Sequence, residues 1–318
     1  MTLFGYFLSC EEQTPDELLR QAELAEQAGF EGLWISDHFH PWLDEQGHSP
    51  FVWSMIGALS ERISIPVTTA VTCPIMRIHP AIIAQAAATS QVMLKGRFRL
   101  GVGSGEALNE HITGEPWPPT PVRLEMLEES IEVIRKLWSG KMVTHRGRHY
   151  TVDTARIYTL PDTPPPIHIS AYGPKSADVA GRIGDGLVTT KPDKEVLDQF
   201  RKSGGQGKPT LGGFKVCWGP DEDEAVKTVH RRWRNEQIPG EAGQVLQVPR
   251  HFAGASELVT EDTVRQNVAC GPDVDRHVEM VKTYVDAGFD EVYINQVGPT
   301  SPEFFDFYKN KVLPRVRG

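Results

Sequence analysis

Acid–base and aromatic side chains gather in residues 36–42, SDHFHPW, directly after the apolar run 32–35. A histidine can take a hydroxyl proton near neutral pH, because the unperturbed imidazole pKa is about 6.5. His38 is therefore a candidate acid or base, with Asp37 or Glu106 as a carboxylate that tunes it. The alternative is a polar loop whose charges face water.

Polar or aromatic groups follow four further apolar runs in the same way. They are Thr72 and Cys73; Ser104, Glu106 and Asn109; Tyr172, Gly173 and Lys175; and Thr190 and Lys191. In a barrel of parallel strands, catalytic groups lie where the strands end at the carboxyl side. We therefore expect five loops to offer these groups to one mouth.

Residues 101–110, GVGSGEALNE, contain a Gly-x-Gly pattern, but Glu106 stands where a dinucleotide fingerprint needs its third glycine. The glycines allow the backbone to pass close to a flat ligand, with Glu106 at its edge. A flexible loop with a solvated glutamate is the alternative. Gly173 and Pro174 precede a predicted helix, which suits a phosphate at the helix N-terminus, although plain helix capping explains them equally well.

Short apolar runs alternate with helical patterns along the whole chain, which favours a (β/α)8 barrel over a doubly wound sheet. The predicted strands cover 3–9, 32–36, 66–71, 98–103, 166–171, 186–190, 209–218 and 291–297. The predicted helices cover 14–29, 49–62, 79–94, 121–139, 173–184, 193–203, 221–235, 273–288 and 301–316.

Three segments interrupt this alternation. Residues 104–120 and 236–272 are predicted as long loops, the second rich in Gly, Pro and Gln, and long loops in a compact domain often form lids or walls. A hairpin is expected at 143–152, within an insertion near 141–160. Decorative insertions are the alternative for all three, and we expect residues 1–318 to form one barrel domain.

The composition excludes several classes of protein. A chain of 318 residues with 39% hydrophobic and 24% charged residues is typical of a globular protein, and its formal charge of −9 argues against a nucleic-acid surface. No apolar stretch approaches the roughly 20 residues that cross a bilayer, and no signal segment is predicted. Four widely spaced cysteines indicate neither a zinc site nor a disulfide framework, so we expect a cytoplasmic protein. We do not expect Asp37, His38 and His40 to bind a metal, because neighbours on one turn rarely converge without further partners.

Five motifs in order, SDHFHPW, GHSPFVWS, HPAIIAQAAAT, GVGSGEALNE and AGRIGDG, identify a resemblance that covers nearly the whole chain. The chain resembles the luciferase-like superfamily, and within it the group typified by the glucose-6-phosphate dehydrogenases that use the deazaflavin coenzyme F420. The resemblance implies hydride transfer between a substrate carbon and C5 of the deazaflavin, and it implies a homodimer. A deazaflavin accepts a hydride but reacts poorly with oxygen, so the site needs a base for the alcohol proton.

The resemblance also implies roles for individual residues. His38 resembles the base that removes the hydroxyl proton, Trp42 the partner on the substrate side, and Glu106 the acid that serves N1 of the cofactor. The implied cofactor contacts are Asp37, Ser104, Gly105, Asn109, Ala171, Tyr172, Gly173, Pro174 and Lys175, with a cis peptide bond at Ala70-Val71 behind the ring.

The substrate side departs from the pattern of the glucose-6-phosphate enzymes, which hold the phosphate with two lysines and one arginine. Only the arginine has a clear counterpart, Arg265. One family lysine falls near Phe252, beside Arg250, and the other near Asp193, between Lys191 and Lys194, with Thr190 close by. We therefore expect a less charged alcohol, or its carbonyl partner, as the substrate.

Three other functions compete with this interpretation. They are an F420-dependent dehydrogenase of glucose 6-phosphate or another sugar phosphate, a flavin mononucleotide (FMN) monooxygenase, and a non-catalytic flavin-binding barrel. Glu106 together with the intact SDHFHPW motif favours F420 chemistry over both flavin alternatives.

Overall fold

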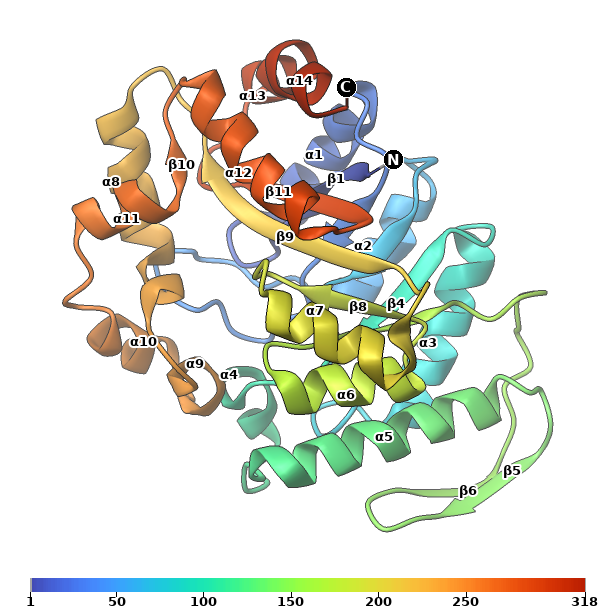
Figure 1. Cartoon of the computed structure of the whole chain (residues 1–318). Helices are drawn as coiled ribbons and strands as arrows, with labels where there is room; N and C mark the ends of the chain where they lie inside the picture. Colours follow the sequence, from blue (N-terminus) through green and yellow to red (C-terminus); the bar gives the residue numbers. More distant parts are fainter. Residues whose placement is uncertain (1, 318) are drawn as a thin grey trace.

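Eight parallel strands close into a barrel in the computed structural model, which describes residues 2–317 (Figure 1). The ring runs β1-β2-β3-β4-β7-β8-β9-β11 and returns to β1. Its strands are β1 (Leu3–Leu8), β2 (Leu33–Ile35), β3 (Val67–Thr69), β4 (Phe98–Val102), β7 (Ile167–Ser170), β8 (Gly186–Thr189), β9 (Thr210–Cys217) and β11 (Glu291–Gln296). The predicted (β/α)8 barrel and all eight predicted strands are confirmed.

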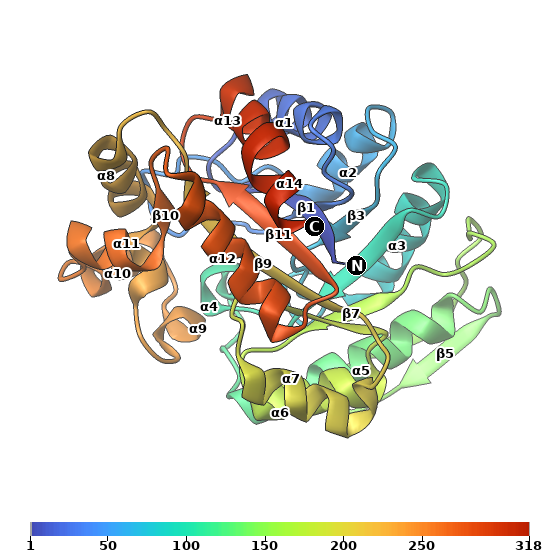
Figure 2. The same cartoon turned by 45° about the horizontal axis from the view of Figure 1, so that its top comes forward.

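Helices surround the ring, as Figures 1 and 2 show. They are α1 (Pro15–Gln27), α2 (Val52–Ser60), α3 (Pro80–Met93), α5 (Thr120–Leu137), α6 (Pro174–Ile183), α7 (Lys194–Phe200), α8 (Glu222–Trp233), α12 (Val274–Ala287), α13 (Pro302–Phe307) and α14 (Leu313–Val316). Helix α1 begins as its sequence predicts, because the Thr14 side chain accepts a hydrogen bond from the Glu17 N–H and Pro15 occupies the first turn.

The first two insertions contain short elements of secondary structure. Residues 104–120 contain the short helix α4 (Ala107–Glu110) and a 3₁₀ turn (His111–Thr113). The hairpin consists of β5 (Val143–Arg146) and β6 (Thr151–Ala155), which project beyond α5, away from the barrel (Figure 1).

The third insertion differs from the prediction of a long irregular loop. Most of residues 236–272 lie in α9 (Ala242–Val245), α10 (Pro249–Ala255), α11 (Glu261–Asn267) and β10 (Ala269–Cys270). The first two helices have four and seven residues, too few for an apolar repeat to be recognised in the sequence. Strand β10 extends the sheet at the carboxyl end of β9, opposite Val216 and Cys217.

Stacked aromatic side chains fill the barrel interior. The rings of Trp34 on β2 and Tyr293 on β11 stack 4.4 Å apart, and both residues are fully buried. Phe7 on β1 meets the Trp34 ring edge-on, 5.6 Å away. The interior is therefore a packed core, and space for a ligand lies at the carboxyl ends of the strands. Among residues 2–317, no helix has the length and apolar character that a bilayer crossing requires.

Candidate active site

A cavity of about 1350 Å³ lies at the carboxyl ends of the barrel strands. Most of the predicted site residues line it: Asp37, His38, Trp42, Ala70, Val71, Ser104, Gly105, Glu106, Asn109, Tyr172, Gly173, Pro174, Lys175, Thr190, Lys191 and Phe252. Ala171 is buried beside this wall. Loops after five different strands thus contribute residues to one mouth.

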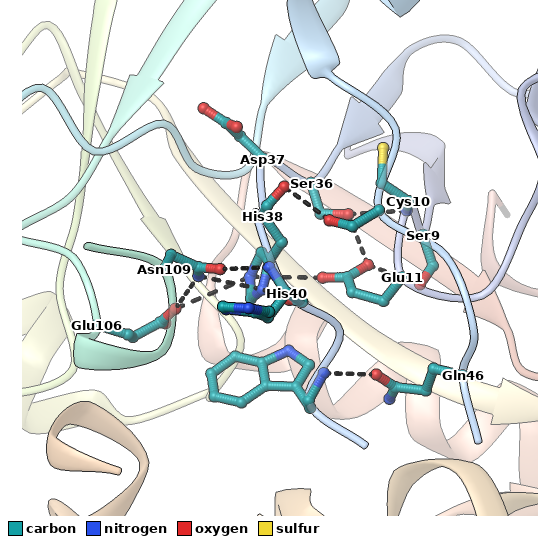
Figure 3. A network of polar contacts seen from close by, with 12 residues as sticks. Ser9, Cys10, Glu11, Ser36, Asp37, His38, His40, Gln46, Glu106 and Asn109 are labelled. Atoms are coloured by element: carbon teal, nitrogen blue, oxygen red, sulfur yellow. Dashed lines mark hydrogen bonds and ion pairs between the residues drawn. The ribbon is translucent and has the colours of Figure 1, made fainter. Parts of the chain in front are cut away.

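His38 lies between two carboxylates at the end of β2 (Figure 3). Its Nε2 atom is 3.4 Å from Oε1 of Glu11 and 3.8 Å from Oε2 of Glu106. Its Nδ1 atom is 3.3 Å from the carbonyl oxygen of His40 and 3.1 Å from Nδ2 of Asn109. The tautomer decides which of these contacts is a hydrogen bond. With the hydrogen on Nδ1, it donates to the His40 carbonyl and Nε2 keeps a lone pair that can accept a proton; with the hydrogen on Nε2, Nδ1 accepts from the Asn109 amide.

Asn109 on α4 fixes the position of the imidazole. Its Oδ1 atom accepts hydrogen bonds from the backbone N–H groups of Phe39 and His40, at 2.9 and 3.3 Å, which defines the orientation of the amide. Its Nδ2 atom therefore faces His38 Nδ1 and donates to Glu106 Oε2 at 3.2 Å. The amide connects the loop after β2 with the loop after β4.

Glu11 is a site residue that the sequence analysis missed. Its Oε2 atom accepts hydrogen bonds from the hydroxyls of Ser9 and Ser36, at 2.9 and 2.7 Å. Burial pushes the pKa of this carboxyl upward, but the charge of His38 and the Ser36 hydroxyl outweigh it and leave the pKa lowered. Glu11 follows β1 just as Asp37 follows β2, so its position after a strand could have revealed it.

The carboxyl pKa of Glu106 shifts in the opposite direction. About a third of its side chain, 31%, faces the cavity, but the surrounding protein removes enough water to raise the pKa against the attraction of His38. Carboxyl groups whose pKa values are driven apart are suited to different roles in proton transfer.

Trp42 forms an aromatic wall next to the imidazole. Its ring is 5.0 Å from the ring of His38 and 5.1 Å from the ring of Phe252, which it meets edge-on. Phe252 on α10 is 1% exposed. An aromatic side chain thus occupies the position near which a family lysine was expected.

A flat apolar floor lies between the loops after β3 and β4. The Ala70–Val71 peptide bond is cis, as the resemblance implies. Gly103 passes so close that a Cβ atom there would be 2.9 Å from a methyl carbon of Val71, and Gly105 has a φ of 74°. Gly103 therefore packs directly against Val71, and both residues line the cavity.

Asp37 is held by an ion pair that the sequence analysis did not predict. Its carboxylate accepts from Arg77 Nη2 at 2.8 Å and from the Thr72 hydroxyl at 2.6 Å. Arg77 also donates its backbone N–H to Glu110 at 2.7 Å. This network connects β2, the segment after β3, and α4.

The N-terminus of α6 forms another wall of the cavity. Gly173, at the N-cap, has no side chain to satisfy the first-turn N–H groups, and Pro174, Lys175 and Ser176 also line the cavity. The Tyr172 hydroxyl accepts a hydrogen bond from Thr190 at 3.0 Å, and half of the Tyr172 surface is exposed. Unpaired N–H groups and the helix dipole suit an anionic group here.

Three predicted substrate-side cations lie away from the cavity wall, and these predictions are corrected. Arg265 points to the outer face of α8, where it pairs with Glu222 at 2.9 Å and Asp223 at 2.7 Å. Asn267, at the end of α11, the helix that carries Arg265, lines the cavity instead. The other two are Lys194, which pairs with Asp198 within α7, and Arg250, which is exposed on α10.

No set of three or more His, Cys, Asp or Glu side chains within residues 2–317 is arranged to hold a metal ion.

The family model described as luciferase-like monooxygenase matches residues 2–291. The chain belongs to the luciferase-like family. The family resemblance predicted from the five motifs is thereby confirmed.

Two sequence relatives and one solved structure illustrate where this luciferase-like chain lies within the family. An F420-dependent glucose-6-phosphate dehydrogenase of Microbacterium testaceum is 36% identical, over 99% of this chain and 97% of the relative. An F420-dependent hydroxymycolic acid dehydrogenase of Mycobacterium tuberculosis is also 36% identical, over 98% of this chain and 88% of the relative. An F420-dependent secondary alcohol dehydrogenase, solved with an F420-acetone adduct, is 34% identical. The match covers 100% of this chain and 99% of the solved chain, with a TM-score of 0.92.

Proposed function

We propose that the chain is a coenzyme F420-dependent oxidoreductase that moves a hydride between an alcohol, or its carbonyl partner, and C5 of the deazaflavin. The observation that carries this proposal is His38, held between Glu11 and Glu106 beside the flat floor of Val71 and Gly103. It is supported by relatives of nearly equal length whose names specify F420 and a hydroxyl-bearing substrate.

The cavity fits the cofactor in shape and in charge. Ala70, Val71 and the glycine loop would hold the planar ring, and Glu106 would lie at its edge. The N-terminus of α6, with Lys175, would hold an anionic tail. When bound, F420 supplies a hydride acceptor that reacts poorly with oxygen.

The protein's own groups handle the protons. Nε2 of His38 accepts the proton of the substrate hydroxyl, and the imidazolium that forms lies 3.4 Å from Glu11. Glu11 can stabilise this cation because its lowered pKa keeps it ionised. Glu106, whose pKa is raised, is the carboxyl suited to hold a proton at Oε2. Trp42 covers the substrate side and excludes water.

The substrate we propose is an alcohol without a phosphate, or its carbonyl partner. Arg265 and Lys194 are engaged by carboxylates outside the cavity, and Phe252 adds an apolar surface. Each absent cation removes a charge-assisted contact worth about 1.5–3 kcal/mol to a phosphate. Glucose 6-phosphate is accordingly a poor substrate of this chain, which separates it from its relatives of that name.

An anaerobic assay tests this function. The protein is mixed with oxidised F420 and a panel of uncharged secondary alcohols, and in the reverse direction with reduced F420 and the matching ketones. We expect turnover in both directions and a lower kcat/KM for glucose 6-phosphate. A millimolar or lower KM for glucose 6-phosphate that Arg265→Ala abolishes would contradict the substrate assignment, and turnover with FMN and oxygen would contradict the cofactor assignment.

We also propose that the chain works as a cytoplasmic homodimer. Apolar side chains of the first half of the barrel are exposed on or next to α2 and α3, namely Phe51, Ile82, Val92 and Met93. All four cysteines are free and buried, which suits a reducing compartment. Sedimentation equilibrium of the wild type and of Ile82→Asp tests the dimer, which the aspartate should weaken.

A further inference from the structure

The substrate side of the cavity contains a nearly buried cation, Lys215. Its side chain is 10% exposed and leaves the carboxyl-terminal part of β9. The ammonium group forms an ion pair with Glu236 and lies 3.9 Å from the ring centroid of Trp233. It is also 5.7 Å from the ring centroid of Phe7. The Lys215 ammonium group is therefore surrounded by one carboxylate and two aromatic rings.

Lys215 belongs to the same end of the cavity as the catalytic histidine. Its charge contributes to lowering the pKa of Glu11, whose carboxylate is 3.4 Å from His38. Lys215, Trp233 and Glu236 all line the cavity. The other two lysines on the cavity wall, Lys175 and Lys191, are exposed and follow β7 and β8.

Glu236 is held in place by the short segment that carries it. It lies in the 3₁₀ turn Arg234–Gln237, which runs from the end of α8 into the third insertion. The neighbouring Gln237 accepts a hydrogen bond from the Asn267 amide at 2.8 Å, and this ties the turn to the end of α11. The carboxylate is therefore supplied by the same insertion that covers the substrate side.

This arrangement works against a negatively charged substrate. The ammonium group of Lys215 is already engaged, so a substrate anion would have to displace Glu236 from it. The anion would also approach the carboxylate of Glu11, which lines the same cavity. The two like charges would repel each other. Discrimination between partners commonly rests on such a repulsive element.

We propose that Glu236 determines substrate specificity: by neutralising Lys215 it makes the cavity accept uncharged alcohols and carbonyl compounds and reject anionic ones. The inference rests on the proposed function. It adds a residue to that account and implies that the cavity contains a latent anion site, which removal of the Glu236 charge would expose.

The test compares two secondary alcohols of equal shape, 3-hydroxybutyrate and its amide, which differ by one negative charge. The measurement is the ratio of their kcat/KM values with saturating F420. In Glu236→Gln the freed lysine should form a charge-assisted bond to the anion, so the ratio of anion to amide should rise about 10- to 100-fold over wild type.

Three further variants make the result specific. The double variant K215M/E236Q removes the cation and should lose the gain. Lys215→Met alone leaves Glu236 without its partner, so its ratio should fall below that of the wild type. Glu224→Gln is the matched control, because it breaks the Glu224–Lys227 pair on the exposed side of α8 and should leave the ratio unchanged.

The outcomes separate this inference from the proposed function. If wild type and Glu236→Gln both oxidise the amide with F420 but share the same ratio, the inference about Glu236 is wrong and the proposed function stands. A ratio of anion to amide kcat/KM in Lys215→Met equal to that of the wild type would also overturn the inference about Glu236, even if Glu236→Gln failed to fold. If the wild type neither binds F420 nor oxidises the amide, both proposals fail.

Discussion

Two glutamates flank a single imidazole, yet their carboxyl pKa values move in opposite directions. Glu11 is buried among hydroxyl donors and near cationic groups, which lower its pKa. Glu106 has a single amide donor and meets a second carboxylate across His38, and burial raises its pKa. The same residue type can therefore serve as an ionised partner on one side of the ring and as a proton carrier on the other.

His38→Ala removes the proposed base, and we expect it to lower kcat by about 10²–10⁴-fold while F420 affinity stays nearly unchanged. In the proposed function the imidazole acts on the substrate proton. Its neighbours Glu11 and Asn109 keep hydrogen bonds that do not involve it, from the Ser36 hydroxyl and the Phe39 N–H. Single-turnover kinetics and a separate cofactor titration measure the two quantities. Retention of more than about a tenth of the activity would require another base.

The opposed shifts predict opposite effects on stability. Ionising Glu106 in the folded protein is unfavourable, so Glu106→Gln should gain unfolding free energy relative to wild type as pH rises from about 4 through the raised pKa. Glu11 stabilises the fold when ionised, so Glu11→Gln should lose relative stability as pH rises from its lowered pKa past the unfolded value of about 4.3.

Urea unfolding of the cofactor-free protein across this range measures both differences, and each variant is the control for the other. Shifts of the same sign in the two variants would show that the pKa values of Glu11 and Glu106 are not driven apart as their surroundings indicate.

The sequence located residues better than it located their orientations. His38, Glu106 and Asn109 were predicted because each follows a strand, and the barrel brings strand ends together. Arg265 was misplaced because position along the chain does not reveal which face of α11 points to the cavity. The face is decided by Glu222 and Asp223, which come from a helix 40 or so residues away.

At the scale of elements, the third insertion covers the cavity through a contact that joins two insertions. Gln244 on α9 accepts a hydrogen bond from Arg123 Nη2 at 2.6 Å. Arg123 is 2% exposed at the start of α5, donates to the Pro118 carbonyl at 2.9 Å, and lies over the ring of Trp117. A buried guanidinium thus holds α9 against the loop after β4.

Gln244→Ala should loosen this contact. The loss of a hydrogen bond to a buried charge costs about 1.5–3 kcal/mol, so amide hydrogen exchange in residues 238–247 should become about 10- to 100-fold faster. Val245→Ala is the control, because Val245 is 55% exposed on the same helix. Equal exchange in both variants would show that Arg123 does not hold α9.

The alternation of strands and helices was predictable because each of these elements carries its own pattern, whereas the third insertion does not. Helices α9 and α10 have no apolar periodicity of their own. They form through packing against Trp42 and α4. Only α11 has a clear start signal, since Thr260 caps it and Glu261 and Asp262 follow, and this could have been read from the sequence.

At the scale of the whole molecule, the barrel brings to one mouth groups that are distant in the chain: Glu11, His38, Val71, Glu106 and Lys175. The fold alone permits FMN or F420 chemistry. The account rests on the combination of a base between carboxylates, an apolar floor for a planar ring, and a helix N-terminus for an anionic tail.

The most direct test of this account is an equilibrium titration of the purified protein with F420, FMN and NADP, followed by quenching of protein or cofactor fluorescence. We predict that F420 binds more tightly than either of the other two, and that an uncharged secondary alcohol then reduces it in wild type but not in His38→Ala. Tighter binding of FMN, or reduction of F420 at the wild-type rate by His38→Ala, would contradict the account.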